Sequence, residues 1–151
     1  MRRKQTLAFD DYLFRRCDEL HQIGGDVDLS MVNATTRGDP VILDARIGYP
    51  DEVELEVFEF VERTSTGGAH RVKFRYQGRW QERLLVRFER DPIGHPEMPG
   101  HKHMIAADGT ETRVAWTTTV TPTSASVDMW HEYNLLKSRL EPGDELATRT
   151  A

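Results

Sequence analysis

Three of the six histidines in the 151-residue chain stand close together in sequence, at His95, His101 and His103. Imidazole titrates near neutral pH, so paired histidines suit general acid–base catalysis. If the HKH triplet at 101–103 is a strand, His101 and His103 project from one face and Lys102 from the other. We therefore expect His101 and His103 to be the leading catalytic residues, with His95 as the third.

A metal site is an alternative use of the same side chains. Two imidazoles at alternate positions of a strand can converge on one ion, and His95 could add a third ligand. Glu97 or Asp91 could complete such a site. No carboxylate or cysteine stands at a diagnostic spacing from the histidines, however, so the sequence assigns no metal ligand and no cofactor.

A structural role for the histidines is a further alternative. The Asp-Gly pair at 108–109 is typical of a tight hairpin turn between two strands. That turn would place His101 near Trp116 and His103 near Val114. Both imidazoles would then be half-buried packing residues.

A group of basic side chains precedes the histidines, in the segment 69–90. With a turn at 77–79, the basic residues of this hairpin share one face, and Lys73 lies directly opposite Arg83. Clustered guanidinium groups suit phosphate because each offers paired donors. The candidate contacts for an RNA or DNA backbone are Arg71, Lys73, Arg75, Arg83, Arg87 and Lys102. In the alternative, the acidic segment 51–62, which has no lysine or arginine, neutralises them across the sheet.

The periodicities along the chain predict an α+β domain, in which an antiparallel meander of about six strands carries an N-terminal and a C-terminal helix. Helical spacing covers 6–25 and a segment from Thr123 or Ser124 to about 141–143. Alternating segments predict strands at 40–50, 51–63, 69–77, 80–90, 101–107 and 110–120, with a bulge or two-sided burial near Val57. Residues 26–39 predict a loop or a short strand. We expect one domain over 1–143 and a frayed tail at 144–151.

The composition favours a cytoplasmic protein. Cys17 is the single cysteine, so it has no internal disulfide partner. No apolar run has the length of a signal peptide or a membrane span, so we expect no membrane partner. The formal net charge of -5 argues against a nucleic-acid-binding surface over the whole molecule, but not against a local one.

From Val72 to Ile105 the order of features resembles the TumE-type family of small toxin-like proteins from toxin–antitoxin pairs. Members carry an arginine–aromatic–aspartate strand end, a His-Pro loop and a His-x-His. The matching residues are Arg87, Phe88, His95, Pro96, His101, Lys102 and His103, and Glu89 stands near where the aspartate is expected. The resemblance implies a growth-inhibiting toxin, or a descendant of one, with a helix-turn-helix antitoxin as its partner.

The first hypothesis is a TumE-like toxin domain that acts on nucleic acid, with RNA as the preferred target. If the chain is an enzyme, metal-independent ribonuclease chemistry is the expected reaction. A non-enzymatic protein-interaction module and a histidine-based metal-binding protein are the alternatives. The sequence leaves the oligomeric state open.

Overall fold

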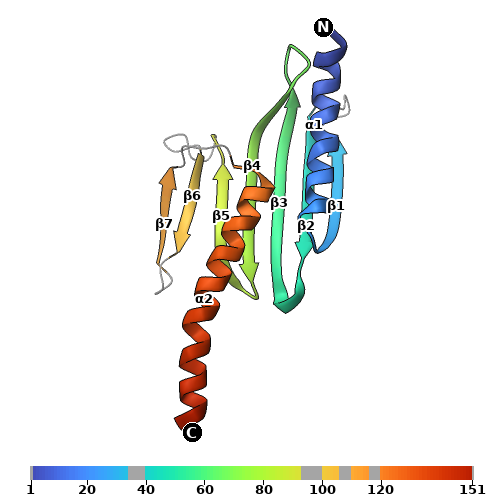
Figure 1. Ribbon diagram of the computed structural model, residues 1–151. Coiled ribbons are helices and arrows are strands. Elements are labelled where there is room, and N and C mark those ends of the chain that lie inside the picture. Colours follow the sequence, from blue (N-terminus) through green and yellow to red (C-terminus); the bar gives the residue numbers. More distant parts are fainter. Residues whose placement is uncertain (1, 34–39, 93–99, 106–109, 116–119, 151) are drawn as a thin grey trace.

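The computed structural model describes residues 2–33, 40–92, 100–105, 110–115 and 120–150. Its centre is one antiparallel sheet of seven strands that pair in chain order, and two helices cover the same face of that sheet (Figure 1). The predicted α+β meander with a helix at each end is confirmed. The elements are α1 (Arg2–Gln22), β1 (Asp26–Asn33), β2 (Val41–Gly48), the 3-10 helix η1 (Pro50–Glu52), β3 (Val53–Arg63), β4 (Ala69–Trp80), β5 (Arg83–Arg90), β6 (Gly100–Ile105), β7 (Glu111–Ala115) and α2 (Pro122–Thr150).

Strand β1 is the element that the periodicity described least well. It pairs with β2 along its whole length, from Asp26 opposite Gly48 to Asn33 opposite Val41. It is an edge strand, and most of its side chains are exposed. Since little of β1 enters the core, its sequence lacks the strict alternation that marks a half-buried strand.

Alternate residues of the central strands form the core beneath the helices. The buried apolar side chains of β2 and β3 are Val41, Leu43, Ala45, Ile47, Val53, Leu55, Val57 and Val61. The alternation of β3 runs unbroken through Val57, so of the two predicted alternatives the bulge at Val57 is wrong, and the half-buried Phe58 and Phe60 on the other face agree with burial on both faces. Glu59 takes the core position between Val57 and Val61, and the register shifts only between Phe60 and Val61.

Helix α1 ends where the chain needs a conformation that favours glycine. Gly24 and Gly25 have φ angles of 94° and 92°, in the region that side chains rarely adopt. At Gly25 a Cβ atom would also stand 2.8 Å from the carbonyl oxygen of Gly48. The pair therefore ends the helix and brings the chain directly into β1, beside the end of β2.

The hairpin between β4 and β5 turns at Gln81 and Glu82, not at the predicted 77–79. Trp80 pairs with Arg83, and Gln81 has a φ of 56°. The expected opposition of Lys73 and Arg83 is consequently wrong, because β4 continues for three residues beyond Gln77 before it turns.

Gly78 serves helix packing rather than a turn. A Cβ atom at this position would lie 2.4 Å from Cγ and 2.6 Å from Sδ of Met129 on α2. The missing side chain therefore lets α2 lie close against β4. Figure 1 shows α2 crossing β4 and β5, whereas α1 lies over the β1–β3 side of the sheet.

Helix α2 starts behind a reciprocal cap. The backbone N–H of Ser124 donates to Oγ1 of Thr121 at 3.1 Å, and the N–H of Thr121 donates to Oγ of Ser124 at 2.9 Å. Pro122 occupies the first helical position, where its missing N–H costs nothing. The helix then passes through 141–143, where the sequence predicted its end, and continues to Thr150.

Neither helix has a stretch in its described residues that is long and apolar enough to cross a membrane.

Candidate functional site

The histidine pair lies on the sheet face opposite the helices. In β6, His101 pairs with Glu89 of β5 and His103 pairs with Arg87. Directly paired residues project from the same side of a sheet, so all four side chains share this face. Phe88 projects the other way, into the core with Val86 and Tyr76.

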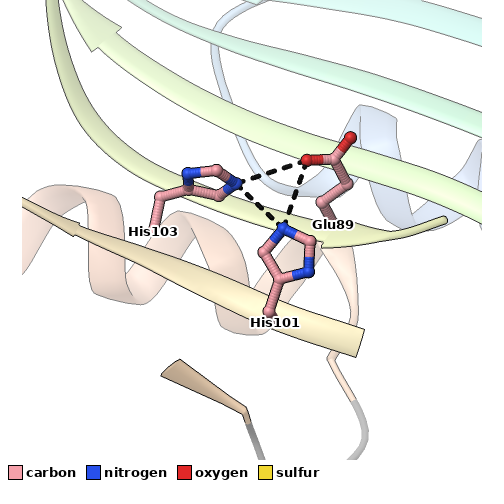
Figure 2. Close-up of side chains that lie close together, drawn as sticks. All are labelled: Glu89, His101 and His103. Atoms are coloured by element: carbon pink, nitrogen blue, oxygen red, sulfur yellow. Dashed lines mark hydrogen bonds and ion pairs between the residues drawn. The ribbon is translucent and has the colours of Figure 1, made fainter. Parts of the chain in front are cut away.

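Glu89, His101 and His103 converge on a common point (Figure 2). We call these three residues the His–Glu centre. The two Nε2 atoms are 3.0 Å apart, and Oε2 of Glu89 lies 3.4 Å from that of His101 and 3.3 Å from that of His103. The exposed fractions are 8% for Glu89, 0% for His101 and 5% for His103. The centre is therefore buried although no helix of the described residues covers this side of the sheet.

Glu111 determines which ring nitrogen of His103 carries the proton. This residue of the edge strand β7 contacts Nδ1 of His103 through Oε1. An ionised carboxylate can only accept, so Nδ1 carries the proton and donates it to Glu111. In neutral His103 the Nε2 atom then presents a lone pair to the centre.

One arginine adjoins the His–Glu centre and another borders it. Nε of Arg87 stands 3.6 Å from Oε2 of Glu89, the same oxygen that faces both imidazoles. Arg75 of β4 is the other pairing partner of Glu89 and is exposed. Fixed positive charge thus borders the centre on the β4–β5 side.

The predicted basic contacts divide between the two faces. Lys73, Arg75 and Arg87 lie on the same face as the His–Glu centre, since they alternate with the core residues Phe74, Tyr76 and Phe88. Lys73 is half exposed, and its Nζ is 3.8 Å from a carboxylate oxygen of Asp91. These three side chains share one face, as the sequence predicted, although the predicted cross-strand pairing is wrong.

Arg71 does not share that face. The register shift opposite Phe60 and Val61 leaves Val72 unpaired, which reverses the alternation between Arg71 and Lys73. Arg71 consequently points to the helix side, where Nη1 donates to the Tyr76 hydroxyl at 2.5 Å and to the Val120 carbonyl oxygen at 2.6 Å. It ties β4 to the start of α2.

Lys102 and Arg83 also lie elsewhere. Lys102 is on the helix side, as its alternation with the histidines predicted, with Nζ 3.5 Å from Oδ2 of Asp128 on α2. Arg83 follows the β4–β5 turn and is paired with Trp80, whose ring packs edge-on against an α2 tyrosine. The predicted face shared by all five basic residues of the hairpin is therefore wrong for Arg71 and Arg83, because a bulge and the shifted turn change the alternation.

The predicted loop histidine and turn fall outside the described residues. His95 and Glu97 belong to the segment 93–99, and the Asp-Gly pair belongs to 106–109. The strand register of the β6–β7 pair is nevertheless clear, with His101 opposite Ala115 and His103 opposite Arg113. This register is one residue away from the predicted one.

A second buried polar cluster lies on the opposite side of the sheet, under α1. Glu59 is fully buried, and it accepts hydrogen bonds from the hydroxyls of Tyr12 and Tyr76. Nε of Arg16 stands 2.9 Å from Glu59 Oε2, as an ion pair. Burial raises the pKa of Tyr76 well above its ordinary value, and the nearby Glu59 carboxylate raises it further. Every member of this cluster has a partner within the core, which indicates a structural role.

The His–Glu centre differs from that cluster because its three polar atoms all face one another. Nitrogen and carboxylate donors in this arrangement can pass protons among themselves or can jointly hold a cation. Glu111 was not named from the sequence, and Glu89 was named only as the residue near the expected aspartate of the family motif, with no role in the site. Glu89 could have been found from its position in β5, since it alternates with Phe88 and so shares the face of the histidines. Glu111 required the β6–β7 register.

A model of the protein family described as Toxin TumE matches residues 15–136. The match extends well beyond the Val72–Ile105 region of the predicted resemblance, and includes the last part of α1, all of β1–β7 and about the first half of α2. Comparisons with curated proteins and with solved structures found no match.

Proposed function

Since the chain belongs to the TumE toxin family, we propose that it is a toxin that acts on RNA in the cytoplasm, at the His–Glu centre. The supporting observation is the position of this centre beside cationic side chains, of which Lys73 and Arg75 are exposed and Arg87 is partly buried. Lys73, Arg75 and Arg87 lie on the same sheet face as His101 and His103. Cations on that face can hold phosphate groups, and the nitrogen and carboxylate groups of the centre can act on a bound phosphodiester either by proton transfer or by holding a cation.

In this proposal the two imidazoles act together at one point and are not a separate general base and general acid. Displacement at phosphorus places the attacking and leaving oxygens roughly in line, on opposite sides of the phosphorus atom. A separate general base and general acid would have to stand on those two sides. The Nε2 atoms of His101 and His103 instead face each other at 3.0 Å, with Glu89 beside both.

A toxin of a toxin–antitoxin pair needs a partner that neutralises it. We propose that this partner is an antitoxin with a helix-turn-helix fold, as the family resemblance implies. Co-expression of the neighbouring reading frame tests this partner: rescue of growth together with co-purification supports it. A neighbour that neither binds the chain nor restores growth counts against it.

Growth inhibition tests the role of the histidines. The chain is induced in a bacterial host and compared with His101→Ala/His103→Ala. The matched control is His70→Ala/His131→Ala, which removes two exposed histidines outside the centre, on β4 and α2. We expect the first double variant to lose inhibition and the second to retain it. Full inhibition by a correctly folded His101→Ala/His103→Ala protein would refute the proposal, and circular dichroism checks folding.

RNA binding tests the cationic face. Lys73→Gln and Arg75→Gln are compared with Arg15→Gln, an exposed arginine on α1. Each lost phosphate contact should reduce the salt dependence of binding. The negative slope of log K against log salt should therefore become shallower by about 1. The control should leave the slope unchanged. Equal slopes in all three variants, or intact RNA with the active toxin, would exclude RNA as the target.

A further inference from the structure

We propose that Glu89, His101 and His103 form a binding site for one divalent transition-metal ion, of which Zn²⁺ is the reference case. The ligand atoms are Oε2 of Glu89 and Nε2 of both histidines, at separations of 3.0, 3.3 and 3.4 Å. Ligands about 2.0–2.1 Å from an ion are about 3.3 Å apart at tetrahedral angles and about 2.9 Å apart at octahedral angles. The three measured separations fall within or close to this interval.

The separations fit an ion better than they fit hydrogen bonds alone. A proton on one Nε2 atom lies in the plane of its ring and can point along one side of the triangle only. The distances from both histidines to Glu89 are long for charge-assisted hydrogen bonds, which are typically about 2.7–2.9 Å. An ion above the three atoms would satisfy all three at once. Figure 2 shows one ring nitrogen of each histidine and one carboxylate oxygen of Glu89 directed toward one another.

Glu111 prepares His103 as a ligand. Its carboxylate accepts the Nδ1 proton of His103, so Nε2 is the nitrogen available to a metal. Metal-bound histidines almost always donate their other ring proton to a carboxylate, a carbonyl or water, which orients the ring. The contact between these residues is the arrangement expected around a metal site.

Burial and charge also agree with an ion. All three candidate ligands are nearly or fully buried. Glu89 and Glu111 contribute two negative charges against the one positive charge of Arg87, so the surroundings keep a net negative charge that favours a cation. Nε of Arg87 is 3.6 Å from the Glu89 oxygen, and one carboxylate oxygen can accept more than one interaction.

The ligand count indicates what such an ion would do. Two histidines and one carboxylate leave coordination positions open, as in catalytic sites, whereas structural zinc sites have four protein ligands. An open position suits a bound water or a phosphate oxygen. Any part of the ion in growth inhibition rests on the proposed function, but its binding does not.

Metal titration tests the site directly. The full chain, without a histidine tag, is stripped with a chelator, dialysed and titrated with ZnCl₂ by calorimetry, and with CoCl₂ by visible absorption. We expect one ion per chain in the wild type and in His70→Ala/His131→Ala. Binding should be lost in His101→Ala/His103→Ala and in Glu89→Gln. Glu111→Gln should weaken binding by about 10- to 100-fold, because it removes the group that orients His103.

The outcomes separate this site from the proposed function. Equal binding by the wild type and folded His101→Ala/His103→Ala, or no stoichiometric binding by the wild type, would overturn the metal site. Glu89→Gln and Glu111→Gln keep the side-chain volume, so they provide the same test if the histidine variants fail to fold. One bound ion without RNA cleavage supports the site and counts against the RNA target. RNA cleavage by a chain that binds no ion overturns the site and leaves the proposed function standing.

Discussion

Arg16 should be among the most important charged residues for stability, although its neighbour Arg15 should be nearly dispensable. The Arg16 side chain is 9% exposed and pairs with the fully buried Glu59, whereas Arg15 is 78% exposed and pairs with Asp11 on the surface. Arg16→Met would leave a buried carboxylate without its nearest cation, and loss of one partner of a buried pair costs about 3–5 kcal/mol.

The hydrogen bonds that Glu59 keeps place the expected cost at the lower end of that interval. Tyr12 and Tyr76 still donate to the carboxylate, and Tyr76 connects it to Arg71. We therefore expect Arg16→Met to lower the free energy of unfolding by about 3 kcal/mol. The control Arg15→Met should change it by less than about 0.5 kcal/mol, as exposed helical ion pairs do.

Urea denaturation followed by circular dichroism measures both changes. With a denaturant slope of about 2 kcal/mol per molar, Arg16→Met should lower the midpoint by about 1.5 M. In a Glu59→Gln background the same substitution should cost only about 1 kcal/mol, because the amide keeps an oxygen acceptor but carries no charge. Equal costs for Arg16→Met in the two backgrounds, or equal costs for Arg15→Met and Arg16→Met, would refute a stabilising charge pair.

Three further predictions concern packing, bonding and pH. Gly78→Ala should destabilise the fold by about 1–3 kcal/mol in urea denaturation, since its Cβ would meet Met129, and Met129→Ala should recover part of the loss. Arg71→Met should lower the free energy of unfolding by about 1–2 kcal/mol in the same assay, because its hydrogen bonds in the core are lost. Lys73→Met should lower it by less than about 0.5 kcal/mol. The reverse order would contradict the placement of Arg71 on the helix side and Lys73 on the other face. The pKa of Tyr76 is raised above 10.0 by burial, so unfolded chains release its proton first and stability should fall as pH rises beyond about 10. Urea midpoints measured between about pH 8 and 11 should show a shallower fall in Tyr76→Phe, and an unchanged slope would contradict this origin.

Much of the fold could be predicted because alternation and helical spacing are set by burial. The strands with one buried face, such as Val41–Gly48, were found for this reason. The β4–β5 turn was misplaced because a glycine at position 78 can have either of two structural roles. Glycine suits a turn, but here it makes room for α2, while Gln81 adopts the positive φ. Only the contact between Gly78 and Met129 of α2 distinguishes the two roles.

The site could be predicted in part. The shared face of His101 and His103 follows from their spacing alone, whereas their nearest acidic neighbours follow from strand pairing. Bulges limit any such prediction, because one extra residue reverses every side chain beyond it. Val72 is such a residue, and it moves Arg71 from the predicted phosphate face into the core network.

The strand that holds Glu111 has a further consequence for the His–Glu centre. β7 is the outer strand of the meander and pairs with a single neighbour, β6, whereas Glu89 lies in a strand that is paired on both sides. Outer strands separate from a sheet by local unfolding at a lower free energy than inner ones. Detachment of β7 would remove Glu111, the acceptor of the Nδ1 proton of His103, while Glu89, His101 and His103 stayed in β5 and β6. The proton arrangement of the centre is therefore coupled to the docking of a five-residue strand.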